Sequence, residues 1–325
     1  MTTLYLDRRD LSLELHGRTL VVRSEGAHHG TVPLHLVDRV VMRSAVEIES
    51  SLLARLADAG VGVLIFGGIN ASKLAVVQGR AHNDGARRVG QYRRYDDLAW
   101  RQRWSRRLVL GKIKGQARLL RRALGERPDL RLALSDGITR VESARARITE
   151  QSLVSVDSLR GVEGAAAAAY FKAYTHLFPS ALDFSGRNRR RPRDPVNAVL
   201  FLGYTLLHFE AVRAIYVAGL DPIIGYFHEL TFGRESLACD LVEPLRPHVD
   251  AWAWEQFRAR NLREEHFARQ GEACLLGKAG RQHFYRELEA LLRPLRRVLR
   301  RFTGKLAAAL AETGAAVLPG SEGTQ

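Results

Sequence analysis

Cysteine is scarce in this chain of 325 residues: only Cys239 and Cys274 are present, far apart and without a CxxC pattern. Two such residues build neither a disulfide framework nor a thiolate zinc site, so the composition indicates a reduced, cytoplasmic protein. The first ten residues are too polar for a secretion signal. Long apolar runs are also missing, since the longest, 61–69 and 196–207, fall short of the ~20 residues that span a bilayer. We therefore expect no membrane partner.

Acidic residues are in deficit. The chain has 50 Lys and Arg against 35 Asp and Glu, a formal net charge of +15, and its 46% apolar content excludes disordered and fibrous classes. In residues 1–85 nine basic and nine acidic side chains cancel, so the whole excess lies beyond residue 85, most densely at 87–122, 187–193 and 293–305. Because neutralising phosphates releases condensed counterions, a polyanion is the expected partner. Solvated helix faces are the alternative.

The hydrophobic periodicity changes near residue 85. Short alternating or β-branched runs separated by glycines, such as Leu11 to His16 before Gly17, fill residues 1–85 and predict a small β-rich domain. Later apolar residues recur at helical spacing, for instance Trp100, Trp104 and Leu108. The tryptophans are interleaved with arginines and could stack on bases, but this spacing is more typical of a core stripe. We predict an α+β fold, with a larger all-α domain over residues 86–325. Its helices are expected at 86–124, 129–149, 157–178, 194–219, 236–260 and 281–313.

The first segment whose residues could take part in catalysis or metal binding is SLACDLVEPLRP. It places Asp240 and Glu243 three residues apart on one helical face. Upstream, His228 in GYFHELTFGR lies in a loop that can fold back over the start of the same helix. A mixed oxygen and nitrogen metal site is one interpretation. The alternatives are a solvated acidic face and an ordinary loop histidine.

A second segment, LRGVEGAAAAAYF, surrounds Glu163 with glycine and alanine. Such a helix has little side-chain bulk, so a neighbouring backbone or a ligand can approach it closely. Small residues in a helix are typical of tight packing, and a carboxylate buried there needs a partner or a cation. Glu163 is therefore a candidate metal ligand.

The third segment, GRNRRRPRDPVNA, is a basic run that leads directly into a helix. Its arginines can contact phosphates, and the helix N-terminus adds free N–H groups suited to anions. We predict DNA binding by Arg187, Arg189, Arg190 and Arg191.

Together, in this order and spacing, the three segments resemble the CRISPR-associated integrase family, the first and most universal of the Cas proteins, also described as metal-dependent DNA endonucleases. The resemblance covers essentially the whole chain. It implies a site for Mg²⁺ or Mn²⁺ formed by Glu163, His228 and Glu243, with Asp240 as a further acidic catalytic residue. The matching motif also includes Asn197 and Tyr204, without an assigned role.

The resemblance also implies the reaction and the partners. A DNA 3′-hydroxyl would attack a phosphodiester of the CRISPR repeat, so that short duplex DNA is inserted as a new spacer. The helical domain would be catalytic, and the β-rich domain would serve for dimerisation and partner contacts. The implied partners are double-stranded DNA, a second copy of the chain and the small second Cas protein of the adaptation complex. The alternatives are a metal-dependent nuclease on branched DNA in repair and a non-enzymatic nucleic-acid-binding scaffold.

Overall fold

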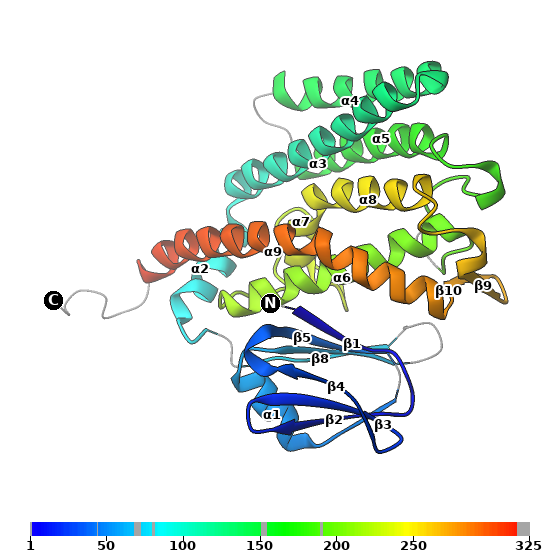
Figure 1. The fold of residues 1–325 in the computed structure, drawn as a ribbon. Coiled ribbons are helices and arrows are strands. Elements are labelled where there is room, and N and C mark those ends of the chain that lie inside the picture. The colour runs from blue at the N-terminus through cyan, green and yellow to red at the C-terminus, as the bar shows by residue number, and fades with distance from the viewer. Residues whose placement is uncertain are drawn as a thin grey trace. The chain divides into compact units, whose positions relative to one another are not determined.

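The computed structural model describes residues 2–43, 45–67, 73–79, 82–150, 155–188 and 191–316. The chain forms two compact units, Met1–Ala81 and His82–Gln325. Figure 1 shows that the first unit consists mainly of strands and the second mainly of helices. The predicted α+β fold, β-rich first and helical afterwards, is confirmed.

The first unit contains two four-stranded sheets, with strand orders β4-β3-β2-β6 and β1-β5-β7-β8. In the first sheet β2 pairs antiparallel with β3 and parallel with β6, whereas in the second β5 lies parallel between β1 and β7. The strands are β1 (Thr2–Leu6), β2 (Leu11–His16), β3 (Thr19–Ser24), β4 (Ala27–Pro33), β5 (Val37–Met42), β6 (Val46–Ile48), β7 (Gly62–Gly67) and β8 (Lys73–Val77). One helix, α1 (Ser50–Asp58), completes the unit.

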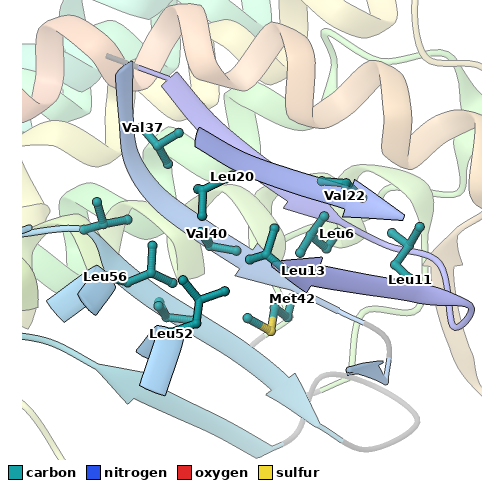
Figure 2. Close-up of a cluster of buried hydrophobic side chains, with 12 residues drawn as sticks. Leu6, Leu11, Leu13, Leu20, Val22, Val37, Val40, Met42, Leu52 and Leu56 are labelled. Atoms are coloured by element: carbon teal, nitrogen blue, oxygen red, sulfur yellow. The ribbon is translucent and has the colours of Figure 1, made fainter. Parts of the chain in front are cut away.

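The core of this unit follows from the alternation of its strands. In β2 the side chains of Leu11 and Leu13 are buried, and the residues between them are more exposed. Figure 2 shows Leu13 beside Val40 and Met42 of β5, in a cluster that also contains Leu11 and, from α1, Leu52 and Leu56. Burying each of these side chains stabilises the fold by roughly 1.5–3 kcal/mol.

The second unit is built from eight helices within the part of the chain that the structure describes. They are α2 (Gly85–Asp96), α3 (Leu98–Glu126), α4 (Arg131–Glu150), α5 (Val156–Thr175), α6 (Pro195–Val217), α7 (Ser236–Val242), α8 (Arg246–Arg258) and α9 (Lys278–Ala315). Helices α3, α4 and α5 lie side by side, and α9 packs against both α2 and α6 (Figure 1). A single 3₁₀ turn, η4 (Glu243–Leu245), joins α7 to α8.

Helix α6 is the apolar centre of this unit. Among the described helices it alone has the length and the hydropathy to cross a membrane, with a mean hydropathy of 1.4, but 72% of that stretch is buried inside the folded unit. Its composition is that of a core helix. Asp194 caps its first turn by accepting the backbone N–H of Asn197 at 2.8 Å, and Pro195 follows as the first helical residue.

Three features of the second unit differ from the sequence-based expectation. The helix predicted over 86–124 is interrupted at Asp97, whose side chain accepts the N–H of Trp100 and starts a new helix. The helix predicted over 236–260 is divided at η4, because Pro244 and Pro247 cannot donate the backbone hydrogen bonds of a continuous helix. A hairpin of β9 (Phe267–Gln270) and β10 (Ala273–Leu276), which the sequence analysis missed, is added to a unit expected to be all-α.

Candidate metal centre

The predicted acidic residues Glu163 and Glu243 converge on one ammonium group. Lys112 of α3 forms ion pairs with Glu163 of α5 and with Glu243 of η4, and its nitrogen lies 2.5 Å from Glu243 Oε2. All three side chains are largely buried, with exposed fractions of 11% for Lys112, 19% for Glu163 and 6% for Glu243. Three segments far apart in the sequence therefore meet at a single cation position.

The close approach of α3 to η4 depends on two glycines. A Cβ carbon on Gly111 would lie 3.2 Å from Pro244, and one on Gly115 would lie 2.9 Å from Pro247. The glycines are four residues apart, so they share one face of α3 with Lys112 beside it. Because neither carries a side chain, the helix can lie directly against the two prolines that follow Glu243.

His228 is oriented by Asp240. The fully buried Asp240 carboxylate accepts the backbone N–H groups of Tyr226, Phe227 and His228 at 2.7, 3.0 and 3.0 Å, and its Oδ1 lies 2.8 Å from His228 Nδ1. If Nδ1–H donates to this carboxylate, Nε2 keeps its lone pair free. Nε2 faces Glu243 Oε1 at 4.0 Å, so it is directed toward the acidic residues.

Positive charge outweighs burial at Glu243. Burial alone would raise the pKa of this carboxyl, but Arg246 and Lys112 lower it to about 2. Arg246 NH1 lies 3.1 Å from Glu243 Oε1. Burial lowers the pKa of the Lys112 ammonium, but the charges of Glu243 and Glu163 outweigh burial and raise this pKa. The carboxylate is therefore ionised and the lysine protonated at neutral pH.

The donor set suits a divalent cation. Among the described residues no group of three or more His, Cys, Asp and Glu side chains is gathered closely enough to hold a metal ion, because Lys112 stands between the two carboxylates. Glu243 Oε2 is nevertheless buried without a hydrogen bond of acceptable geometry to any described residue. Two carboxylates and an imidazole are ligands for Mg²⁺ and Mn²⁺, and Lys112 marks where such an ion would be held.

The helix around Glu163 does not pack as tightly as its composition suggested. Gly161 and Gly164 are exposed, and a Cβ carbon on either would meet no described atom within 4 Å. The expectation of close helix packing was wrong at these two glycines, which lie on the exposed side of α5. With 3.6 residues per turn they stand about 160° and about 100° around the helix from Glu163, so the side they leave open is not the one that carries Glu163.

The basic segment before α6 is held by Asn197. Its side chain accepts from Arg187 NH1 at 2.7 Å and from the N–H of Asn188 at 3.2 Å, and it donates to the carbonyl of Gly186 at 2.8 Å. Arg191 is exposed, whereas the predicted DNA-binding residues Arg189 and Arg190 lie outside the described residues. Asn197 thus has a structural role that its motif alone did not reveal.

Tyr204 connects this basic segment to the acidic residues. The guanidinium groups of Arg187 and Arg246 lie 5.2 and 5.0 Å from the centre of its ring, which is cation–π range. Its hydroxyl bonds to Asp250, which also accepts from Tyr170. Burial raises the pKa of Asp250 to about 6, although these hydroxyls and the two arginines oppose the shift.

Sequence analysis missed Lys112, Arg246 and Asp250. Arg246 could have been found, because it follows Glu243 by three residues and the two share a helical turn. Lys112 had one local signal, a glycine on each side at four-residue spacing. The tryptophans Trp100 and Trp104 stack on each other at 5.2 Å, and Trp104 is buried, so their spacing reflects packing.

The site combines two carboxylates, a histidine and an arginine-rich segment on one helical unit. Such a set of residues is typical of metal-dependent enzymes that act on nucleic-acid phosphates. Residues 4–290 match the model of the family described as CRISPR associated protein Cas1. The chain belongs to this family, and the resemblance seen in its sequence is confirmed.

Individual proteins agree with this assignment. The CRISPR-associated endonuclease Cas1 1 of Thermodesulfovibrio yellowstonii is 38% identical over 287 residues, which cover 88% of this chain and 89% of that protein. A Cas1 protein from Thermotoga maritima has the same fold, with a TM-score of 0.80, 23% identity and full coverage of both chains. A casposase bound to its integration product gives a TM-score of 0.81 at 22% identity, covering 96% of this chain and 91% of that one. The Cas1-containing chain of a Cas6-RT-Cas1–Cas2 complex gives 0.78 at 21% identity, covering 96% of this chain and 35% of that one.

Proposed function

We propose that this chain is a CRISPR adaptation integrase that inserts short duplex DNA as new spacers into a CRISPR array. As a member of the Cas1 family it is a DNA endonuclease and strand-transferase. The observation that carries the proposal is the convergence of Glu163 and Glu243 on one cation position beside His228 Nε2. A cation at such a position can assist a direct transesterification, in which a DNA 3′-hydroxyl attacks the phosphodiester and no covalent bond to the protein forms.

Glu163, Glu243 and His228 would hold Mg²⁺ or Mn²⁺, which polarises the scissile phosphate and promotes ionisation of the attacking hydroxyl. Imidazole is a softer ligand than Mg²⁺ prefers, so His228 favours Mn²⁺ in vitro. Asp240 has its oxygens occupied by the backbone of residues 226–228 and by the His228 ring. We assign it the role of positioning His228 rather than binding the ion.

The DNA would lie over the helical unit. All of the excess positive charge belongs to residues beyond 85, and the segment with Arg187 and Arg191 leads toward the acidic residues through Tyr204. Residues 187–191 would therefore bind phosphates close to the reacting bond.

The partners would be prespacer and repeat DNA, a second copy of the chain and the small second Cas protein, in the cytoplasm of a prokaryotic cell. The solved complexes of casposase with its integration product and of Cas6-RT-Cas1 with Cas2 support the first and the last of these. Residues 1–85 carry no net charge in the sequence, so this part of the chain is suited to dimerisation and partner contacts rather than to binding phosphates.

Strand transfer tests the proposal. A labelled short duplex is incubated with a plasmid carrying the cognate repeat, with and without the small partner, in Mg²⁺ or Mn²⁺. The wild-type protein should integrate the duplex, whereas Glu163→Gln and Glu243→Gln should lose at least about 10³-fold in rate and keep DNA affinity within a few-fold. Glu150→Gln, at an exposed carboxylate of α4, is the matched control and should remain active.

Two other outcomes would overturn the assignment. Cleavage of branched DNA without any integration would indicate a repair nuclease. DNA binding without metal-dependent activity in the wild-type protein would indicate a scaffold whose acidic cluster is structural.

A further inference from the structure

Lys112 occupies the place between the two carboxylates that a metal ion would need. Its ammonium forms ion pairs with both Glu163 and Glu243, and no other described basic residue contacts both. The side chain is only 11% exposed, so it is held at this position by the fold rather than by chance contact at the surface. The packing of Gly111 and Gly115 on the prolines beside Glu243 fixes the backbone from which Lys112 projects.

Lys112 and Arg246 together neutralise the two glutamates. Glu163 and Glu243 contribute two negative charges, Lys112 and Arg246 contribute two positive charges, and the Asp240 carboxylate behind His228 leaves one net negative charge. A divalent cation added while both basic side chains stay would make the site positive in a poorly solvated region, and the Lys112 ammonium already fills the place between the two glutamates. Binding of the ion there therefore requires that a basic side chain leave.

Lys112 is the side chain that can leave. Of the two glutamates, Arg246 pairs only with Glu243. Its guanidinium is also held against the ring of Tyr204, 5.0 Å from the ring centre. Lysine carries its charge on a flexible four-carbon stem, whereas the planar guanidinium of arginine is fixed by its stacking. A moderate rotation of the Lys112 stem would free both carboxylates, and Arg246 would keep its place.

We propose that Lys112 is a built-in cation that holds Glu163 and Glu243 together before the metal binds and yields its position to the metal. This inference rests on the proposed function, because it takes this site to bind a divalent ion. Competition with the ammonium sets the metal affinity, so the protein releases its ion more readily than the carboxylates alone would allow. The same ammonium prevents the two carboxylates from repelling each other in the metal-free protein.

Isothermal titration of the full-length protein with Mn²⁺, in the absence of DNA, tests the competition. Lys112→Met should bind Mn²⁺ at least about tenfold more tightly than the wild type, because no cation has to be displaced. The metal-free variant should also melt about 5 °C lower, since two neighbouring carboxylates lose their counter-charge, and saturating Mn²⁺ should restore most of the difference.

Lys114→Met is the matched control. Lys114 is exposed on α3 two residues from Lys112, and its replacement removes the same charge from the same helix. It should change neither the affinity for Mn²⁺ nor the melting temperature. Lys112→Gln, which retains a polar donor toward the carboxylates, provides a second variant in case Lys112→Met does not fold, and it too should bind Mn²⁺ more tightly.

The outcomes separate the inference from the proposed function. If the wild-type protein binds Mn²⁺ and both Lys112 variants bind it equally or more weakly, the built-in cation is refuted and the metal site remains. If neither the wild type nor the Lys112 variants bind Mn²⁺, the proposed function fails together with the inference. Equal tightening in Lys114→Met would show a general effect of net charge and would also refute the role of Lys112.

Discussion

Gly115 of α3 lies against Pro247 of α8 so closely that a Cβ carbon on residue 115 would be 2.9 Å from the proline ring. The ring is rigid and stands in the first turn of α8, which follows directly on η4 with Glu243, so it cannot move away without moving the site. This contact sets the distance between α3 and η4, and with it the ion pair between Lys112 and Glu243.

Gly115→Ala is therefore expected to disturb the site although it adds a single methyl group. Overpacking should lower the free energy of unfolding by about 1 to 2 kcal/mol, even though alanine favours the helix. Mn²⁺ affinity should also change, because Glu243 shifts relative to Glu163. Gly125→Ala on the same helix, where a Cβ carbon meets no described atom within 4 Å, should be neutral or stabilising in urea denaturation. Equal effects of the two substitutions would contradict this account.

Asp240→Asn should act through His228. The amide retains one acceptor oxygen but turns its NH₂ group toward backbone donors, so the loop at 226–228 loses part of its support. We expect Mn²⁺ affinity to fall about 10-fold to 100-fold, the range found when partners of metal-binding histidines are replaced. Titration calorimetry measures this change. Asp136→Asn, at an exposed site on α4, is the control, and an unchanged affinity in Asp240→Asn would remove its positioning role.

The asymmetry of charge predicts where phosphates bind. Replacing residues 189–191 with glutamine should flatten the log–log salt dependence of duplex DNA binding by up to about three phosphates, each contributing roughly 0.9 to the slope. The matched triple substitution of Arg8, Arg9 and Arg18 removes the same charge from the first unit and should change the slope little. Fluorescence anisotropy at several salt concentrations gives both slopes. If the two triple variants change the salt slope equally, the prediction that the second unit binds the phosphates is wrong.

His208 should make stability depend on pH. Burial lowers the pKa of this imidazole, but its contacts with Cys239 and Glu235 outweigh burial and raise it to about 9 from 6.5. The folded protein thus holds the proton more tightly than the unfolded chain. The stabilisation is complete below pH 6.5 and is lost as pH rises through 9.

The substitution His208→Gln should therefore destabilise the protein by about 1 to 3 kcal/mol near pH 6 and by much less near pH 9.5. Urea denaturation at the two pH values measures the difference. His29→Gln, at an exposed histidine of β4, should have little effect at either pH. A loss that is the same at both values would mean that His208 is not charged in the folded state.

Local chemistry explains which elements were predictable. The strand Leu11–His16 was predicted with the bounds that the structure has, because alternating burial and the turn at Gly17 are both local. Helix α6, Pro195–Val217, agrees with the helix predicted at 194–219, because its cap Asp194 and the following Pro195 act locally. The hairpin of β9 and β10 was missed, since its short strands have no clear alternation and its turn at Gly271 has a positive φ of 60° that only coordinates reveal.

Periodicity, composition and the order of motifs were sufficient to predict the α+β organisation, the concentration of positive charge beyond residue 85 and the family. The motifs also indicated Glu163, His228 and Glu243 as candidate ligands. The position of Lys112 between the two carboxylates and the support of the His228 loop by Asp240 appear only in the folded chain. Such contacts join residues distant along the chain, and their geometry depends on how closely two helices pack. In this protein Gly111 and Gly115 have no side chains where α3 faces Pro244 and Pro247, and this sets the distance between α3 and the segment with Glu243.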